Sequence, residues 1–165
     1  MSIIENVRDR YAKGAQAVVP ELCCPVDYRA DLLEVLPDEI IDRDYGCGDP
    51  SRFVREGDVV LDLGAGGGKI CYMASQIAGP TGRVIGVDAT DDMLDLSRRH
   101  LIGVGDKIGW HNVEFRHGWI QDLGLDRDKL AAWVAANPIS DLSGLDALAG
   151  EERRLRAEEP LVPDG

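Results

Sequence analysis

One acid and three evenly spaced glycines are the residues of this sequence best suited to bind a ligand. Asp62 lies near the end of the short apolar run 59–63, and together with Gly64, Gly66 and Gly68 it forms the pattern D-x-G-x-G-x-G. Glycine lets the backbone approach a ligand closely and adopt positive φ angles. A glycine loop between a strand and a helix binds nucleotide-like ligands at the carboxyl end of a parallel sheet. The pattern therefore predicts such a binding site.

The acid before the first glycine restricts the kind of ligand. Asp62 would repel a pyrophosphate, and the glycine spacing differs from the G-x-G-x-x-G of dinucleotide-binding loops. A Walker loop is excluded because Lys69 is followed by Ile70 instead of Ser or Thr. The carboxylate suits a ligand with a cationic amino-acid end, such as S-adenosylmethionine (SAM). A nicotinamide or another nucleotide is the alternative.

A second carboxylate strengthens this prediction. Asp88 closes the second predicted strand, 83–87, one strand–helix–strand unit after Asp62. A carboxylate at this position accepts hydrogen bonds from both ribose hydroxyls of a bound nucleoside. We expect the loop 118–122, after the third predicted strand, to reach the adenine. Met93 forms either a wall for the adenine or part of the core.

An alternating strand–helix framework must position these residues. The predicted strands are 59–63, 83–87 with Asp88 at its end, and 113–118, and the predicted helices between them are 69–78 and 91–102. This β-α-β-α-β order predicts an α/β fold, a Rossmann-like parallel sheet with right-handed crossovers and helices on both faces. The continuous apolar run of the first strand is typical of a strand that is buried on both faces.

Helical segments flank this framework. Residues 2–13 are predicted to form an amphipathic helix, and residues 31–41 have helical character with Pro37 near a helix start. Residues 126–136 and the strongly charged 141–158 are two further predicted helices. The predicted organisation is an N-terminal helical and loop cap (1–56), a SAM-binding half of a Rossmann-like domain (57–125) and a helical extension (126–165).

Composition excludes several classes of partner. The 165 residues, which fit one domain, contain 18 Lys and Arg against 30 Asp and Glu, a net charge of −12. This charge disfavours nucleic acid and anionic membrane surfaces as partners. No apolar run is long enough to span a membrane, and the N-terminus lacks the features of a secretory signal. We therefore predict a cytoplasmic location, where the four cysteines remain free thiols.

The motifs resemble a known family. Residues 60–68 and 84–88, together with Met93, resemble the core of class I SAM-dependent methyltransferases. More narrowly, the Tyr-Gly-Cys-Gly element at 45–48 resembles the arsenite methyltransferase-like branch. Residues 23–28 and 118–123 are similar to the same branch. The resemblance runs over nearly the whole chain and corresponds to the N-terminal half of the family's fold.

The resemblance implies SAM as the methyl donor and S-adenosylhomocysteine as the product. Tyr45 and Gly46 would help to close over the methionine end of SAM. The expected cofactor-binding residues are Tyr45, Gly46, Asp62, Gly64, Ala65, Gly66, Gly68, Asp88, Ala89, Met93, Trp119, Ile120 and Gln121. No catalytic base is assigned to this sequence, because the family resemblance places the base of an oxygen or nitrogen acceptor outside it.

The cysteines raise the question of arsenic chemistry. In arsenic-methylating members the cysteine of the Tyr-Gly-Cys-Gly element binds trivalent arsenic, and that position is Cys47 here. Thiolates are soft ligands and suit such a metalloid. Cys23 and Cys24 are the other candidate metalloid ligands, and no resident metal is expected. Those members also use cysteines after the fourth strand, whereas no cysteine follows Cys71 here.

The family's sheet has seven strands, whereas this sequence supplies three. The fourth strand of the family lies beside the first, so the strand at 59–63 would keep an unpaired apolar edge, which invites pairing with another chain. We expect a second polypeptide to supply the remaining strands and much of the acceptor site, with a truncated fragment as the alternative.

Three functions are consistent with these features. The first is the SAM-binding subunit of a methyltransferase that acts on a small molecule. The second is a non-catalytic, regulatory SAM-binding subunit. The third is an arsenite methyltransferase that uses Cys47 with Cys23 or Cys24.

Overall fold

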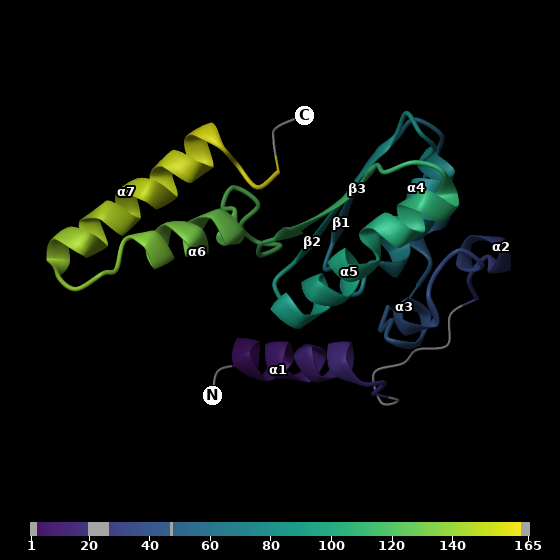
Figure 1. The fold of residues 1–165 in the computed structure, drawn as a ribbon, viewed down its shortest axis with the longest axis horizontal. Coiled ribbons are helices and arrows are strands. Elements are labelled where there is room, and N and C mark those ends of the chain that lie inside the picture. Colours follow the sequence, from purple (N-terminus) through teal and green to yellow (C-terminus); the bar gives the residue numbers. More distant parts are fainter. Residues whose placement is uncertain (1–2, 20–26, 47, 163–165) are drawn as a thin grey trace.

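The computed structural model describes residues 3–19, 27–46 and 48–162. Within them, three parallel strands form an open sheet in the order β1 (Val59–Leu63), β2 (Arg83–Asp88) and β3 (Val113–His117) (Figure 1). The pairing registers place Leu61 beside Ile85, and Ile85 beside Glu114. This sheet confirms the predicted α/β, class I methyltransferase-like fold.

Two crossover helices enclose the core on one face of the sheet. These are α4 (Lys69–Ala78) and α5 (Asp91–Ile108). Cys71, Tyr72 and Met73 of α4 are fully buried, and the ring of Tyr72 meets that of Phe115 edge-on with 5.6 Å between centroids. Alternate strand residues point to opposite faces, so Val84 and Phe115 both join this core.

The other face of the sheet is only partly covered. Ile85 and Val87 of β2 pack there against Leu161. On β1, by contrast, Val59, Leu61 and Leu63 have exposed fractions of 72%, 39% and 47%. The sequence predicted burial of β1 on both faces, and the described residues provide it on one face only. Nor does any described strand pair with the outer edge of β1.

A cap of short helices precedes the sheet. It contains α1 (Ile3–Gln16), α2 (Ala30–Leu33), α3 (Asp38–Asp42) and the 3₁₀ helix η2 (Pro50–Phe53). The hydroxyl of Tyr45 holds the end of α1: it lies 3.0 Å from its acceptor, the Gly14 carbonyl oxygen, and accepts from the Val19 amide at 3.2 Å. A Cβ on Gly14 would lie 2.5 Å from the Tyr45 ring, so this close approach requires glycine.

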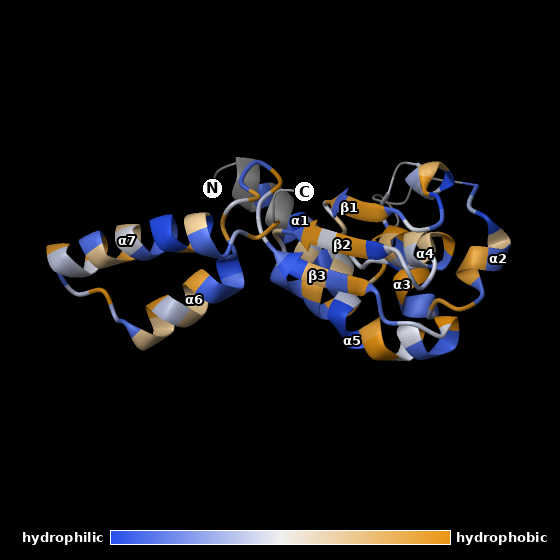
Figure 2. Cartoon of the chain, turned by 90° about the horizontal axis from the view of Figure 1, so that it is seen from above, coloured by the Kyte–Doolittle hydropathy of each residue, from blue (hydrophilic) through white to orange (hydrophobic). Residues whose placement is uncertain are grey.

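A helical hairpin extends away from the sheet (Figures 1 and 2). It consists of α6 (Arg127–Ala136) and α7 (Leu142–Glu158), which begin after the N-cap residues Asp126 and Asp141. Leu155 is the one buried residue of these two helices. In the part of the chain that is described, none of the helices combines the length and apolar character needed to cross a membrane.

Candidate functional site

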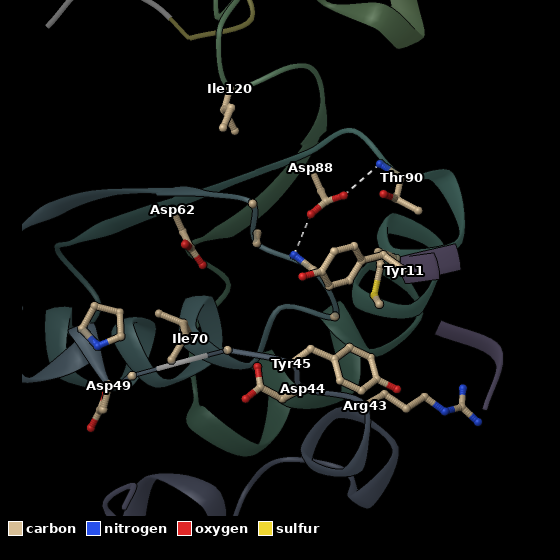
Figure 3. Close-up of a pocket in the computed structure, with 18 of the residues that line it drawn as sticks. Tyr11, Arg43, Asp44, Tyr45, Asp49, Asp62, Ile70, Asp88, Thr90 and Ile120 are labelled. Carbon is tan, nitrogen blue, oxygen red and sulfur yellow. Dashed lines mark hydrogen bonds between the residues drawn. The ribbon is translucent and has the colours of Figure 1, made fainter. Parts of the chain in front are cut away.

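A cavity of about 750 Å³ lies at the carboxyl ends of β1 and β2 (Figure 3). Its volume is within the range of small-molecule binding pockets, ~300–1,000 Å³. Nine of the predicted cofactor-binding residues line it: Tyr45, Gly46, Asp62, Gly64, Ala65, Gly66, Asp88, Met93 and Ile120. The structure therefore brings together residues that are far apart in the sequence.

The glycine loop follows β1 and forms one wall of the cavity. Gly64, Gly66 and Gly68 have φ angles of 82°, 52° and 89°. Residues with a side chain rarely adopt this left-handed backbone conformation. The amides of Gly64 and Ala65 donate to the Val87 carbonyl oxygen at 2.8 and 3.1 Å, which fixes the loop against the end of β2. No heavy atom lies within 4 Å of a Cβ built on Gly64, which leaves space for a ligand.

Asp88 connects the glycine loop to the start of α5. One carboxylate oxygen accepts from the Gly66 amide at 2.9 Å and the other accepts from the Thr90 amide at 2.8 Å (Figure 3). Each carboxylate oxygen can accept a further hydrogen bond. The side chain is thus held in place and keeps acceptor capacity toward the cavity, as a ribose-binding role requires.

Asp62 lies at the end of β1 in a partly buried position. Burial raises the pKa of its carboxyl group, because loss of water disfavours the charged form. The Cys71 thiol donates to Asp62 Oδ2 at 3.2 Å, and burial raises the pKa of this thiol. Cys71 is therefore a protonated donor that orients Asp62, and a cationic ligand group would stabilise the carboxylate.

A buried ion pair joins the cap to the glycine loop. Lys69, the first residue of α4, is 5% exposed, and its Nζ pairs with Asp44. The same Nζ lies 3.5 Å from the centroid of the Tyr28 ring, and the Tyr28 hydroxyl donates to Asp44 at 3.0 Å. This cluster holds the loop 44–46, which lines the cavity, against the start of α4.

Four of the predicted cofactor residues do not line the cavity. A Cβ on Gly68 would lie 2.6 Å from Phe115 Cζ, so Gly68 is needed for packing beneath the loop. Trp119 is covered by the Arg127 guanidinium, 4.4 Å from a ring centroid. Ala89 and Gln121 also lie off the cavity wall. The candidate metalloid ligands Cys23, Cys24 and Cys47 lie outside the described residues.

The sequence did not single out some residues that line the cavity. Tyr11 comes from α1, and its ring lies 6.4 Å from that of Tyr45 between centroids. Arg52 and Phe53 come from η2. No motif marks these positions, because they reach the cavity only through the way the cap packs on the sheet. The contacts of Tyr45 with the end of α1, together with the hydrogen bond from Gln16 to Asp92 of α5, hold the helix that carries Tyr11 at the cavity.

The chain belongs to the methyltransferase domain family, whose sequence model matches residues 55–156. An arsenite methyltransferase of Aquipseudomonas alcaligenes is 36% identical over 126 residues, which cover 72% of this chain and 36% of that protein. The arsenite methyltransferase of Halobacterium salinarum is 44% identical over 104 residues, covering 62% of this chain and 25% of that protein.

A solved structure agrees with these sequence matches. The arsenic(III) S-adenosylmethionine methyltransferase of Chlamydomonas reinhardtii superposes with a TM-score of 0.51 at 31% identity, covering 69% of this chain and 45% of that one. These findings confirm the predicted family and branch, and SAM as the cofactor of that family. The chain spans about a quarter to about a third of the length of the curated relatives given above.

Proposed function

We propose that this chain is the SAM-binding part of a class I methyltransferase that acts on a small molecule. The observation that carries the proposal is the cavity in which Asp62, the glycine loop and Asp88 meet. Asp88 is held by two backbone amides so that its remaining lone pairs receive the ribose hydroxyls. Asp62 receives the cationic ammonium of the amino-acid end.

Positioning is the main catalytic contribution of these residues. When bound, SAM supplies an electrophilic methyl group on a sulfonium, which is the difficult part of the chemistry. The chain's own residues would hold the donor, with Asp62 at its amino-acid end and Asp88 at its ribose. Holding the donor and an acceptor in a fixed arrangement would reduce the loss of entropy in the transition state.

Calorimetry with SAM tests the proposal directly. We expect saturable binding by the full chain and at least tenfold weaker binding by Asp88→Ala, because two ribose hydrogen bonds are lost. Asp95→Ala is the matched control, since Asp95 is an exposed carboxylate of α5 that does not line the cavity. Equal binding by Asp88→Ala and wild type would contradict the proposed site.

The relatives favour trivalent arsenic as the methyl acceptor. The arsenite methyltransferases that this chain resembles carry this activity in their names, and Cys47 occupies the cysteine position of the Tyr-Gly-Cys-Gly element. We propose that Cys47, with Cys23 or Cys24, binds arsenite. Titration with arsenite should show thiol-dependent binding that Cys47→Ser weakens and Cys71→Ser preserves. Arsenite binding that is insensitive to Cys47→Ser, Cys23→Ser and Cys24→Ser would exclude this acceptor site.

We further propose that a second polypeptide completes the sheet along β1. Unpaired backbone groups and the exposed side chains of Val59, Leu61 and Leu63 support this proposal. A non-catalytic SAM-binding subunit is the alternative function. It predicts SAM binding without methyl transfer in the reconstituted complex, whereas the enzyme predicts transfer that Asp88→Ala abolishes.

A further inference from the structure

The carboxylates on the cavity wall complement the positive charge of SAM but not its negative charge. Among the residues that the structure describes, four carboxylates line the cavity: Asp44, Asp49, Asp62 and Asp88. The amino-acid end of SAM carries an ammonium, which these acids attract, and also a carboxylate, which they repel. A carboxylate removed from water in this setting needs a cation with good hydrogen-bonding geometry. The question is which cationic side chain supplies it.

Contacts on the wall leave one candidate. Arg43 is already engaged, because its Nη1 donates to the Ala15 carbonyl oxygen at 2.7 Å and to Glu39 at 2.6 Å. Lys69 is buried against Asp44. Among the residues described by the structure, Arg52 is therefore the cavity-lining cation that no carboxylate pairs with.

The backbone that carries Arg52 is well held. Asp49 caps η2 by accepting from the Ser51 amide at 3.0 Å, and Ser51 itself is 1% exposed. The guanidinium lies 4.8 Å from the centroid of the Phe53 ring, and Phe53 is 71% exposed. Arg52 thus lines the cavity from a fixed turn, with its guanidinium beside an exposed aromatic ring.

We propose that Arg52 binds the carboxylate of the amino-acid end of SAM, while Asp62 binds its ammonium. This inference rests on the proposed function, because it assigns a role within the same SAM site. A guanidinium forms two parallel hydrogen bonds to a carboxylate, which an ammonium group cannot reproduce. The pair Arg52 and Asp62 then selects a zwitterionic amino-acid end over a ligand that carries only the ammonium.

Paired calorimetric titrations with SAM and decarboxylated SAM test this role. Decarboxylated SAM keeps the sulfonium, the ribose and the ammonium but lacks the carboxylate. We expect Arg52→Met to weaken SAM binding at least tenfold and to leave the binding of decarboxylated SAM within twofold of wild type. Arg52→Lys should restore part of the loss. Arg55→Met is the control, because Arg55 is an exposed arginine three residues away that does not line the cavity.

The outcomes separate this proposal from the proposed function. Equal weakening of both ligands by Arg52→Met would indicate a structural role for η2 and overturn the carboxylate assignment. Unchanged SAM binding by Arg52→Met would also overturn it, while leaving the SAM site in place. Absence of SAM binding by the folded wild-type chain would overturn the proposed function together with this inference. Circular dichroism of each variant establishes that it is folded.

Discussion

Asp62 occupies a position in which a ligand-binding carboxylate costs stability. Burial raises its pKa, so the folded chain binds a proton at Asp62 more tightly than the unfolded chain. This group therefore favours folding most below the ordinary Asp pKa, and that contribution is lost as the pH rises through the raised pKa. At pH values above the raised pKa, the charged carboxylate of Asp62 destabilises the folded chain by its full desolvation cost. A cationic ligand would offset this cost.

The first prediction concerns Asp62→Asn. We expect this variant to unfold at a higher temperature than wild type at neutral pH without ligand, because the buried charge is removed. The difference should shrink as the pH falls through the raised pKa of Asp62, because the carboxyl group then becomes protonated. SAM should reverse the order at neutral pH, since the amide cannot pair with an ammonium. Thermal denaturation at several pH values, with and without SAM, measures both effects, and a lower melting temperature for the ligand-free variant would contradict this account.

The second prediction distinguishes two glycines of the loop. Gly64→Ala introduces only an unfavourable positive φ, which costs about 1–2 kcal/mol. Gly68→Ala adds a clash with Phe115, so we expect a loss of about 2–5 kcal/mol in the free energy of unfolding. Urea denaturation compares the two variants. Equal losses would show that the packing beneath Gly68 adjusts easily.

The bounds of a helix can be predicted from local sequence where residues that end helices flank it. The helix at 69–78 was predicted with the bounds of α4, because glycines flank it on both sides. The predicted helix at 91–102 was too short, since α5 continues to Ile108. Glycine inside this helix serves packing: a Cβ on Gly105 would lie 2.3 Å from His111 Nδ1. This contact depends on how the chain turns back after the end of α5 at Ile108, which helix periodicity does not predict.

The candidate site was predictable to a similar extent. The glycines and Asp88 belong to a motif that indicates ligand binding by itself, and the structure places them at one cavity. Tyr11 and Arg52 belong to no such motif, because they reach the cavity only through the packing of the cap on the sheet. Likewise, the ion pair of Lys69 with Asp44 joins residues 25 positions apart and depends on the tertiary fold.

The third prediction tests this ion pair as a connection between elements. Lys69→Met leaves the Asp44 carboxylate without its cation, which should cost about 3 kcal/mol of stability, the lower end for a buried pair, because Asp44 is 17% exposed. The double variant Asp44→Asn with Lys69→Met should recover much of that loss, because no buried charge remains. Urea denaturation of the four proteins gives the coupling energy. Additive losses from the two substitutions would mean that the pair does not act as a unit.

At the scale of the whole molecule, the described residues leave one face of β1 exposed and its outer edge unpaired. Three apolar side chains of this short strand are exposed, whereas the neighbouring β2 is buried along most of its length. An apolar run is typical of a strand that is buried on both faces of a parallel sheet, but it does not show what covers each face. This is why the burial of β1 was overestimated from sequence.

The fourth prediction follows from this open edge. Without a partner, the chain should self-associate through β1, so that its apparent mass in size-exclusion chromatography with light scattering rises with concentration. Leu61→Lys should reduce this association, because a charge on an edge strand opposes pairing. Leu142→Lys is the matched control, since Leu142 is 79% exposed on α7, in the hairpin that extends away from the sheet. A wild-type chain that stays monomeric at all concentrations and transfers methyl groups by itself would contradict both the open edge and the proposed second polypeptide.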